Sequence, residues 1–394
     1  MKHHPLIAGV AAAGALALIL TGCVPNGTGS RTGASSIGVK ASDTGCELSA
    51  NTAPSGPITF TIENSGSDVT ELEILAEDRL QIVGEKENVG PGTTPSYVAQ
   101  LEPGIYYTSC KPGMVGSGVG QSKLVVTDSG VAVNANASDT KLVAQAVTNY
   151  VSYAKDQVGE LVTDTAAFVA AYESGDAALA KSLYPGARSH YERIEPLAEK
   201  FPELDRAMDI READLSAGDP WTGWHRIEKD LWPPVSGYTT LIAAQRTTLG
   251  DALVSDTSKL YSLLYDHSFS VSLSDVSNGA IALMDEVAAG KITGEEEIWS
   301  HTDLWDFQAN IEGARIAFQN VRGIAEGKGA SGRELVGQID ADFTTLAATL
   351  GQYGSIEAGY RLYGELSTSQ IRELSDQVNA LAEPLSRLTA VVLK

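Results

Sequence analysis

Residues 219–234 read Asp219-Pro-Trp-Thr-Gly-Trp-His-Arg-Ile-Glu-Lys-Asp-Leu-Trp-Pro-Pro234, and they predict one short helix with a polar pair on its buried face. Asp219 can cap the helix, and Pro220 suits its first position. Pro233 and Pro234 cannot continue a helix, so we expect it to span 220–232. At about 100° per residue, the apolar side chains fall on one arc and the polar ones opposite. The apolar arc holds Trp221, Trp224, Ile227, Leu231 and Trp232, and the opposite face holds Thr222, Arg226, Lys229 and Asp230.

His225 and Glu228 fall on the apolar arc, one turn apart. A polar pair buried among tryptophans needs a partner. A hydrogen bond between the two side chains is the more frequent meaning of an isolated His-x-x-Glu. A bound metal ion is the sharper interpretation, and the spacing leaves both open.

Long amphipathic patterns surround this stretch from residue 138 to residue 394, and they predict an all-α helical bundle. We expect helices at 139–174, 176–199, 203–214, 220–232, 235–266, 273–289, 294–325, 331–350 and 355–392, the last interrupted near residue 366. Bundle cores are places where inward carboxylates and histidines assemble metal sites.

Further carboxylates occur at helical spacing near the His-x-x-Glu pair. Glu192 and Glu195 are one turn apart, Asp209 follows Asp205 by four residues, and Glu296 lies in an acidic run. Each alone is typical of a solvated helix face. Histidine and carboxylates without thiolate suit iron, zinc or manganese.

Residues 39–128 differ in character, because short runs of β-forming residues alternate with turn signals. They predict a small β-sandwich. Residues 101–110, in which a Pro-Gly turn leads into a strand ending at Cys110, resemble a cupredoxin strand. The segment holds no histidine, which excludes a blue-copper site. Cys46 and Cys110 are expected to form a disulfide, or else to join a metal site with Glu71, Glu73 and Glu87.

The chain begins with an export pattern. Basic residues precede an apolar run that ends at Leu20-Thr21-Gly22-Cys23. This pattern predicts a lipoprotein signal peptide over 1–22, a lipidated Cys23 and a flexible tether over 23–38. We expect an exported protein, anchored by its lipid at the outer face of the cytoplasmic membrane, in the periplasm or at the cell surface.

The composition is acidic, with 50 Asp and Glu against 28 Lys and Arg and a formal net charge of −22. Such a balance argues against nucleic acid as a partner and favours cations.

Three long segments, 190–196, 221–232 and 300–313, carry a resemblance to a known family, supported by shorter stretches around Glu71, Glu85 and Cys110. They are similar to the EfeO-type family, the extracytoplasmic components of a bacterial iron uptake system. The helical part also resembles the imelysin-like family, whose Gly-x-His-x-x-Glu motif stands here from Gly223 to Glu228.

The resemblance implies a cupredoxin-like domain before an imelysin-like bundle, with iron bound as Fe²⁺ or Fe³⁺ and delivered to a membrane permease. It implies an iron permease and a haem peroxidase as partners, and copper or a second iron in the first domain. The ligands carried over to the bundle are His225, Glu228, Glu192, Glu195, Asp209 and Glu296.

Two other functions stay open at this point. A metal-dependent peptidase would use His225 and Glu228, but the chain lacks His-Glu-x-x-His, so we expect no enzyme. A structural lipoprotein would use the same pair only as a buried hydrogen bond.

Overall fold

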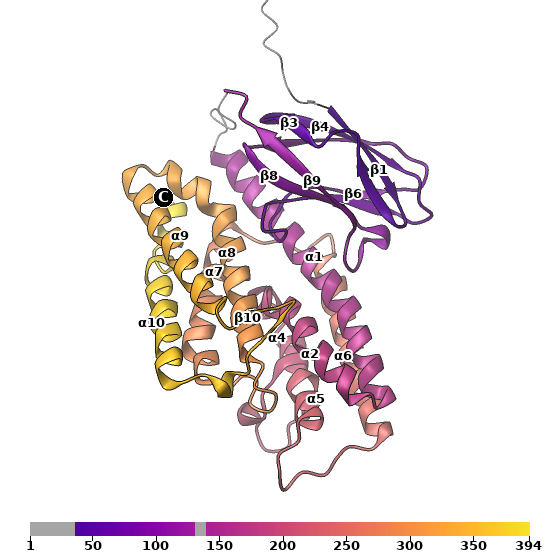
Figure 1. The fold of residues 1–394 in the computed structure, drawn as a ribbon, viewed down its shortest axis with the longest axis vertical. Helices are drawn as coiled ribbons and strands as arrows, with labels where there is room; N and C mark the ends of the chain where they lie inside the picture. Colours follow the sequence, from indigo (N-terminus) through magenta and orange to yellow (C-terminus); the bar gives the residue numbers. More distant parts are fainter. Residues whose placement is uncertain (1–35, 131–138) are drawn as a thin grey trace, which may run out of the picture.

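A β-sheet domain comes first and a helical domain follows it, as the sequence predicts. The computed structural model describes residues 36–130 and 139–394 (Figure 1). The predicted signal peptide, Cys23 and most of the predicted tether lie outside these residues. The predicted fold class, a cupredoxin-like sandwich before a helical bundle, is confirmed.

The first domain consists of two sheets packed face to face. One sheet has the order β2 (Gly45–Leu48), β1 (Ser36–Ser42), β4 (Gly56–Asn64) and β7 (Ser96–Leu101). The other has the order β3 (Thr52–Pro54), β9 (Val119–Thr127), β8 (Gly104–Cys110), β5 (Thr70–Leu75) and β6 (Ile82–Val89). The pairs β1–β4 and β3–β9 are parallel, and the other pairs are antiparallel. Residues 36–38, predicted as the end of the tether, belong to β1.

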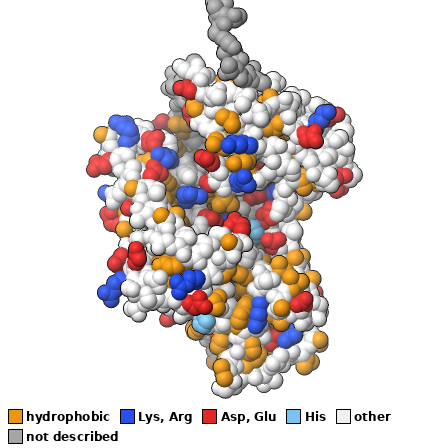
Figure 2. Space-filling view, in the orientation of Figure 1, with side chains coloured by type: hydrophobic (Ala, Val, Ile, Leu, Met, Phe, Trp, Pro, Cys, Tyr) orange, Lys and Arg blue, Asp and Glu red, His pale blue; other side chains and the backbone are white. Residues whose placement is uncertain are grey.

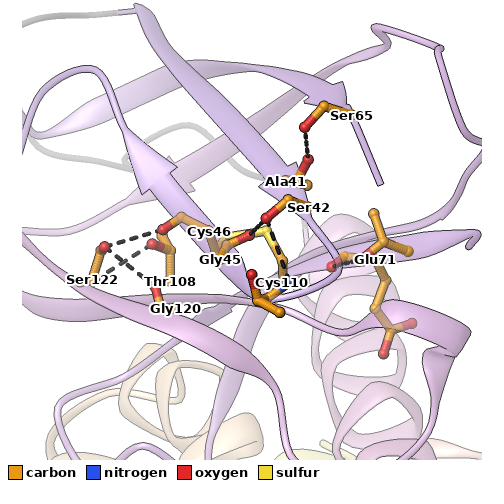
Figure 3. The surroundings of a disulfide bond; sticks show 12 residues. Ala41, Ser42, Gly45, Cys46, Ser65, Glu71, Thr108, Cys110, Gly120 and Ser122 are labelled. Carbon is orange, nitrogen blue, oxygen red and sulfur yellow. Dashed lines mark hydrogen bonds between the residues drawn. A yellow bond between two sulfur atoms is a disulfide. The ribbon is translucent and has the colours of Figure 1, made fainter. Parts of the chain in front are cut away.

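A disulfide joins the two sheets. Cys46 on β2 and Cys110 on β8 are both buried, with their Cα atoms 5.3 Å apart (Figure 3). Because both sulfurs are consumed in this bond, neither is a thiolate that could bind a metal ion. The disulfide therefore excludes both cysteines as ligands of the predicted second metal site.

The glutamates of that predicted site lie at the interface between the domains instead. Glu73 on β5 forms an ion pair with Lys111 at 3.2 Å, and Lys111 also pairs with Asp156 on helix α1 (Asp139–Ser174). Glu87 on β6 pairs with Lys155 of the same helix at 2.9 Å. Two of the three predicted glutamate ligands are thus engaged by lysines that connect the β domain to the bundle.

Glu71 lies on the same buried strand β5 and is 2% exposed. Burial raises the pKa of Glu71 to about 8. It also raises the pKa of Glu85 to about 7, against a hydrogen bond from Ser152 on α1. The whole strand is buried, because Leu72 and Ile74 belong to the sandwich core while Glu73 contacts Lys111, which in turn pairs with Asp156 of α1.

The helical domain is built on two groups of helices, with acidic side chains gathered in the recess below the β domain (Figures 1 and 2). Helix α1 packs against the first group and α8 contacts both groups. The first group contains α2 (Ala177–Glu192), α3 (Glu195–Ala198), α4 (Pro202–Asp209), α5 (Gly223–Leu231) and α6 (Ala243–Leu264). The second contains α7 (Leu273–Ala289), α8 (Asp303–Gly327), α9 (Ala330–Leu350), α10 (Thr368–Leu385) and α11 (Leu388–Val392).

Several expected helices are shorter in the structure than predicted: the helix expected at 176–199 is divided into α2 and α3, the helix expected at 203–214 ends at Asp209, and the helices expected from 220, 235, 294 and 355 begin later. Residues 294–302 form turns before α8, and the segment before α10 holds the short strands β10 (Gly354–Ser355) and β11 (Gly359–Tyr360). The turns at 294–302 matter for function, because they carry Glu296 and Glu297.

Helix α6 begins at Ala243 rather than at 235 because Asp230 holds the preceding loop. Asp230 accepts hydrogen bonds from the Tyr238 hydroxyl at 2.7 Å and the Leu241 N–H at 3.1 Å. The sequence pattern placed Asp230 on the solvent face, but it is 4% exposed. Among the described residues, no helix has the length and apolar character needed to cross a membrane.

Candidate metal centre

Helix α5, which carries the His-x-x-Glu pair, begins at Gly223 and not at Pro220. Asp219, predicted as the cap, instead accepts a hydrogen bond from the Ser216 N–H at 3.0 Å. Gly223 has φ +80°, and a Cβ there would lie 2.0 Å from the Met208 carbonyl oxygen. Only glycine fits this turn, and the turn aims the first residues of α5, including His225, at α4.

We expect Gly223→Ala to destabilise the bundle by about 3 kcal/mol or more, because it adds a steric clash with backbone to a left-handed conformation. The matched control is Gly237→Ala. Gly237 has φ +78°, but a Cβ at this position would meet nothing within 4 Å, so only the conformational cost of about 1–2 kcal/mol applies. Urea unfolding monitored by circular dichroism measures both. Equal losses in the two variants would contradict the prediction.

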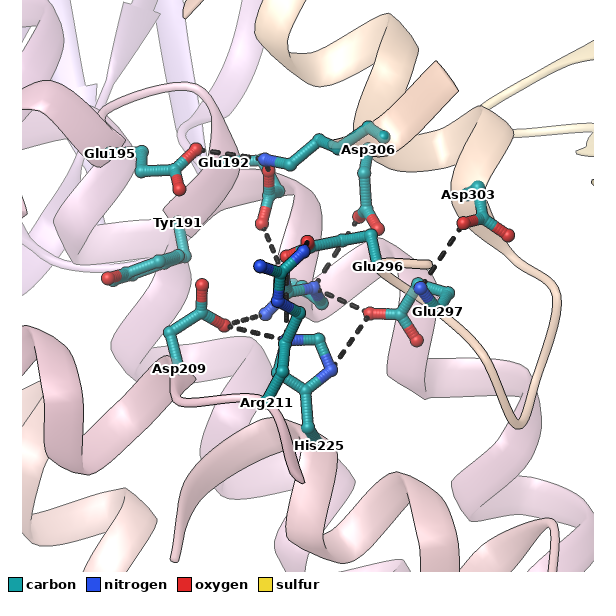
Figure 4. Close-up of polar contacts among 12 residues, drawn as sticks. Tyr191, Glu192, Glu195, Asp209, Arg211, His225, Glu296, Glu297, Asp303 and Asp306 are labelled. Carbon is teal, nitrogen blue, oxygen red and sulfur yellow. Dashed lines mark hydrogen bonds and ion pairs between the residues drawn. The ribbon is translucent and has the colours of Figure 1, made fainter. Parts of the chain in front are cut away.

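His225 lies between four carboxylates, and Figure 4 shows Asp209, Glu296 and Glu297 around its ring. Its Nε2 is 3.4 Å from Asp209 Oδ1 and 3.4 Å from Glu296 Oε1. Its Nδ1 is 3.5 Å from Glu228 Oε2 and 3.9 Å from Glu297 Oε1. His225 is 2% exposed, and neither ring nitrogen has a close hydrogen-bond partner among the described residues. A buried imidazole in this setting can bind a cation once the ring nitrogen has lost its proton.

The two sides of the imidazole differ in how deeply their carboxylates are buried. On the Nδ1 side, Glu228 Oε1 accepts hydrogen bonds from the backbone N–H groups of Trp299 at 2.9 Å and Ser300 at 2.7 Å. Glu297 accepts the Tyr184 hydroxyl at 3.1 Å and the Ser300 hydroxyl at 2.9 Å. Glu228 and Glu297 are also 0% exposed, whereas the Asp209 and Glu296 side chains on the Nε2 side are 11% and 4% exposed. An ion that enters from the surface is therefore better accommodated beside Nε2.

Two buried cations, which the sequence patterns did not identify, hold the surrounding carboxylates. Arg188 on α2 is fully buried and pairs with five of them: Glu192 at 2.6 Å, Glu296 at 2.7 Å, Glu297 at 2.7 Å, Asp306 at 3.6 Å, and Asp209. Lys291 is also fully buried and pairs with Glu192 and with Glu195, the latter at 2.9 Å. The i, i+4 spacing of Arg188 and Glu192 is a sequence signal by which the Arg188 ion pair could have been found. Lys291 lies in an expected loop, where no sequence pattern indicates its partners.

The structure brings together four of the six predicted ligands: His225, Glu228, Asp209 and Glu296. It places Glu192 and Glu195 beside Lys291, away from the group of close ligand atoms around His225. This differs from the prediction, because both glutamates already have a buried cation as a partner. Glu297, which was not predicted, joins His225 and Glu228 in a second such group.

Negative charge exceeds permanent positive charge inside this centre. Its buried or nearly buried carboxylates are Glu192, Glu195, Asp209, Glu228, Glu296, Glu297, Asp303 and Asp306. Against them stand the fully buried Arg188 and Lys291. Burial raises the pKa values of Glu297 and Asp306 well above their usual range. For Glu296, burial is outweighed by Lys291, His225 and Arg188, which hold its pKa well below that range. A multivalent cation would relieve this imbalance.

A cavity of about 480 Å³ leads to the centre from the surface. His225, Glu228 and Glu296 form its inner wall, while Arg211, Asp214 and Trp299 are among the residues of its outer part. The cavity provides an entry path for an ion, which a buried pair with a purely structural role would not need.

Comparison with known proteins supports the division into two parts. The family model described as imelysin matches residues 146–388, and the model described as a cupredoxin-like domain matches residues 11–126. A protein named iron uptake system component EfeO from Yersinia pestis is 37% identical over 362 residues, which cover 90% of this chain and 91% of that protein. A protein of the same name from Escherichia coli O157:H7 is 36% identical over 364 residues, with the same coverage.

Proposed function

This chain belongs to the EfeO family of iron uptake system components, and we propose that it binds an iron ion at His225. We further propose that it delivers this ion to a membrane permease. The observation that carries the proposal is the buried imidazole with two carboxylates at each ring nitrogen and no close hydrogen-bond partner among the described residues.

We assign the ligands to one side of the imidazole. Nε2 of His225, Asp209 and Glu296 bind the ion, since their atoms lie within 4.8 Å of one another. Glu228 accepts a hydrogen bond from the Nδ1–H and orients the ring, as carboxylates next to metal-bound histidines commonly do. Its second oxygen is fixed by two backbone N–H groups, which suits that orienting role. Mixed imidazole and carboxylate ligands are appropriate for iron.

We propose that the protein is a carrier and not an enzyme, although the imelysin family is named as a peptidase family. No second histidine joins the ligand groups found among the described residues, so a two-histidine zinc centre has no support there. We do not extend the proposal to copper or a second iron in the first domain, because its cysteines are joined and lysines engage Glu73 and Glu87.

Export, lipidation at Cys23 and association with an iron permease and a haem peroxidase are part of the proposal. They rest on the N-terminal pattern and on the resemblance to the family. An acidic chain tethered at the membrane surface would gather cations near a permease.

Titration with Fe²⁺ under anaerobic conditions, and with Fe³⁺ supplied as a weak chelate, tests the proposal. We expect one tight site in the wild type for at least one oxidation state. Isothermal calorimetry gives stoichiometry and affinity. The absence of saturable binding of either ion would rule out the carrier function and favour a structural role for the bundle.

Iron binding is expected to release a proton and to tighten as pH rises. Burial and Arg188 lower the pKa of His225, but the surrounding carboxylates outweigh them and raise it well above its usual range. The proton must therefore leave Nε2 before an ion binds, and affinity should change about tenfold per pH unit for each proton released. Calorimetry in two buffers with different ionisation enthalpies counts the protons. An affinity that is constant between pH 6 and pH 8 would contradict the proposed ligand.

A further inference from the structure

Arg211 differs from the two buried cations of the centre in its position. It lies between α4 and the short 3-10 turn at Glu212–Asp214, and its side chain is 30% exposed in the wall of the entry cavity. Its Nη1 donates to Glu296 Oε2 at 3.3 Å, and its Nε donates to Asp214 Oδ2 at 2.8 Å. Arg211 thus contacts an inner carboxylate and an outer one at the same time.

The two oxygens of Glu296 are held differently. Oε1 pairs with Arg188 at 2.7 Å and lies 3.4 Å from His225 Nε2. Oε2 is contacted by Arg211, at a longer distance than the contact of Arg211 with Asp214. Glu296 is 4% exposed, whereas the Asp214 side chain is 51% exposed. The longer of the two Arg211 contacts is therefore the one with the buried carboxylate, Glu296.

An iron ion beside His225 Nε2 would meet Glu296 at Oε1, while the guanidinium of Arg211 contacts Oε2 of the same carboxylate, so the two positive charges would lie close together. Two positive charges a few ångströms apart in a largely buried site repel each other strongly. Arg188 and Lys291 cannot yield, because both are fully buried and each is held by two or more carboxylates. Arg211 can yield, because Asp214 offers it a solvent-exposed partner that it already contacts.

We propose that Arg211 is the displaceable counter-cation of the metal centre. It shares Glu296 with Arg188 when no ion is bound, and it moves entirely onto Asp214 when an ion enters. This inference rests on the proposed iron binding. Its consequence is that Arg211 lowers the affinity for the ion and, by returning to Glu296, promotes release, which a delivery protein requires.

A double-mutant cycle on Arg211 and Asp214 tests the inference, with Fe²⁺ under anaerobic conditions as the probe. We expect R211A to bind about tenfold more tightly than the wild type and to release the ion to a chelator more slowly. We expect D214N to bind several-fold more weakly, because Arg211 has lost its outer partner and stays on Glu296. In the R211A background, D214N should have almost no effect.

The control is E212Q, which removes a carboxylate from the same cavity wall. Glu212 pairs with Lys229 at 2.5 Å and not with Arg211, so its effect should be small and equal in both backgrounds. Circular dichroism and urea unfolding verify that each variant is folded.

Three outcomes would overturn the inference. Affinity that is unchanged or weaker in R211A would show that Arg211 only supports the wall. A D214N effect that is absent in the wild type, or equal in both backgrounds, would show that Asp214 is no outer partner. If the wild type itself shows no iron binding that depends on His225, the proposed function fails and the inference fails with it; the first two results, obtained on a wild type that binds iron, would overturn the inference alone.

Discussion

Replacing His225 by alanine is expected to weaken iron binding by at least about a hundredfold while leaving the bundle folded. The variant removes a ligand nitrogen from a site that offers one imidazole and several carboxylates, and loss of one ligand in a small site is costly. It leaves a small cavity and also removes one positive charge from among four carboxylates. The fold should survive because Arg188 and Lys291 remain in place.

The matched control is His267→Ala, since the His267 side chain is 97% exposed and lies away from the centre. It should bind iron as the wild type does. Calorimetric titration of both variants, with unfolding curves for each, separates loss of a ligand from loss of the fold. Iron binding by His225→Ala at wild-type affinity would remove the helical site from the proposal, whatever the first domain binds.

Glu228→Gln gives a finer division of roles within the same experiment. If Glu228 only orients the ring, an amide oxygen at this position still accepts a hydrogen bond from the Nδ1–H, and affinity falls less than in His225→Ala. If Glu228 is itself a ligand, the two variants should lose comparable affinity.

Replacing Arg188 by methionine is expected to be the most destabilising single change in the helical domain. Arg188 is 0% exposed and pairs with carboxylates from α2, α4, α8 and the 294–302 turns. Without it, these carboxylates face one another in the interior, and breaking a buried ion pair on one side costs about 3–5 kcal/mol. We expect a loss of at least this size in the free energy of unfolding.

The matched control is Arg322→Met on α8. Arg322 pairs with Glu326 at 3.0 Å and Asp340 at 2.7 Å, but its side chain is 42% exposed. Surface pairs of this kind contribute less than about 1 kcal/mol. Urea unfolding compares the two variants. Similar losses would show that the centre does not depend on its buried arginine.

Added iron should restore part of the stability of Arg188→Met, because a bound cation replaces some of the missing positive charge and stabilises the folded state by mass action. A thermal shift with Fe²⁺ that is larger in Arg188→Met than in the wild type would support this explanation. No shift in either protein would contradict the presence of a site for iron beside the arginine.

Much of the architecture follows from local patterns. The bounds of α1 agree with the predicted helix 139–174, because a long amphipathic repeat with turn signals at its end defines a helix by itself. The change from period-two runs to helical repeats separates the domains for the same reason. The His-x-x-Glu pair is buried as its helical arc predicts, since the arc depends only on spacing.

Other features were decided by contacts between distant residues. Helix α5 starts at Gly223 because the Met208 carbonyl oxygen leaves no space for a side chain, and the sequence carries no mark of that contact. Asp230 is buried because the loop before α6 folds back onto it. Glu297 reaches His225 because residues 294–302 are turns, whereas a helix there would direct Glu296 and Glu297 about 100° apart.

The sequence alone determined that the chain has a β domain before a helical bundle, and that a histidine and a glutamate point into the bundle. These results depend on periodicity, which the chain carries locally. The tertiary structure decided which groups surround the histidine. In the tertiary structure, Glu192 and Glu195 form ion pairs with Lys291, and Cys46 forms a disulfide with Cys110. Arg188 lies among the carboxylates around His225. Such assignments depend on which distant charges share a buried space, where every unpaired charge is costly, and spacing along the chain does not encode that.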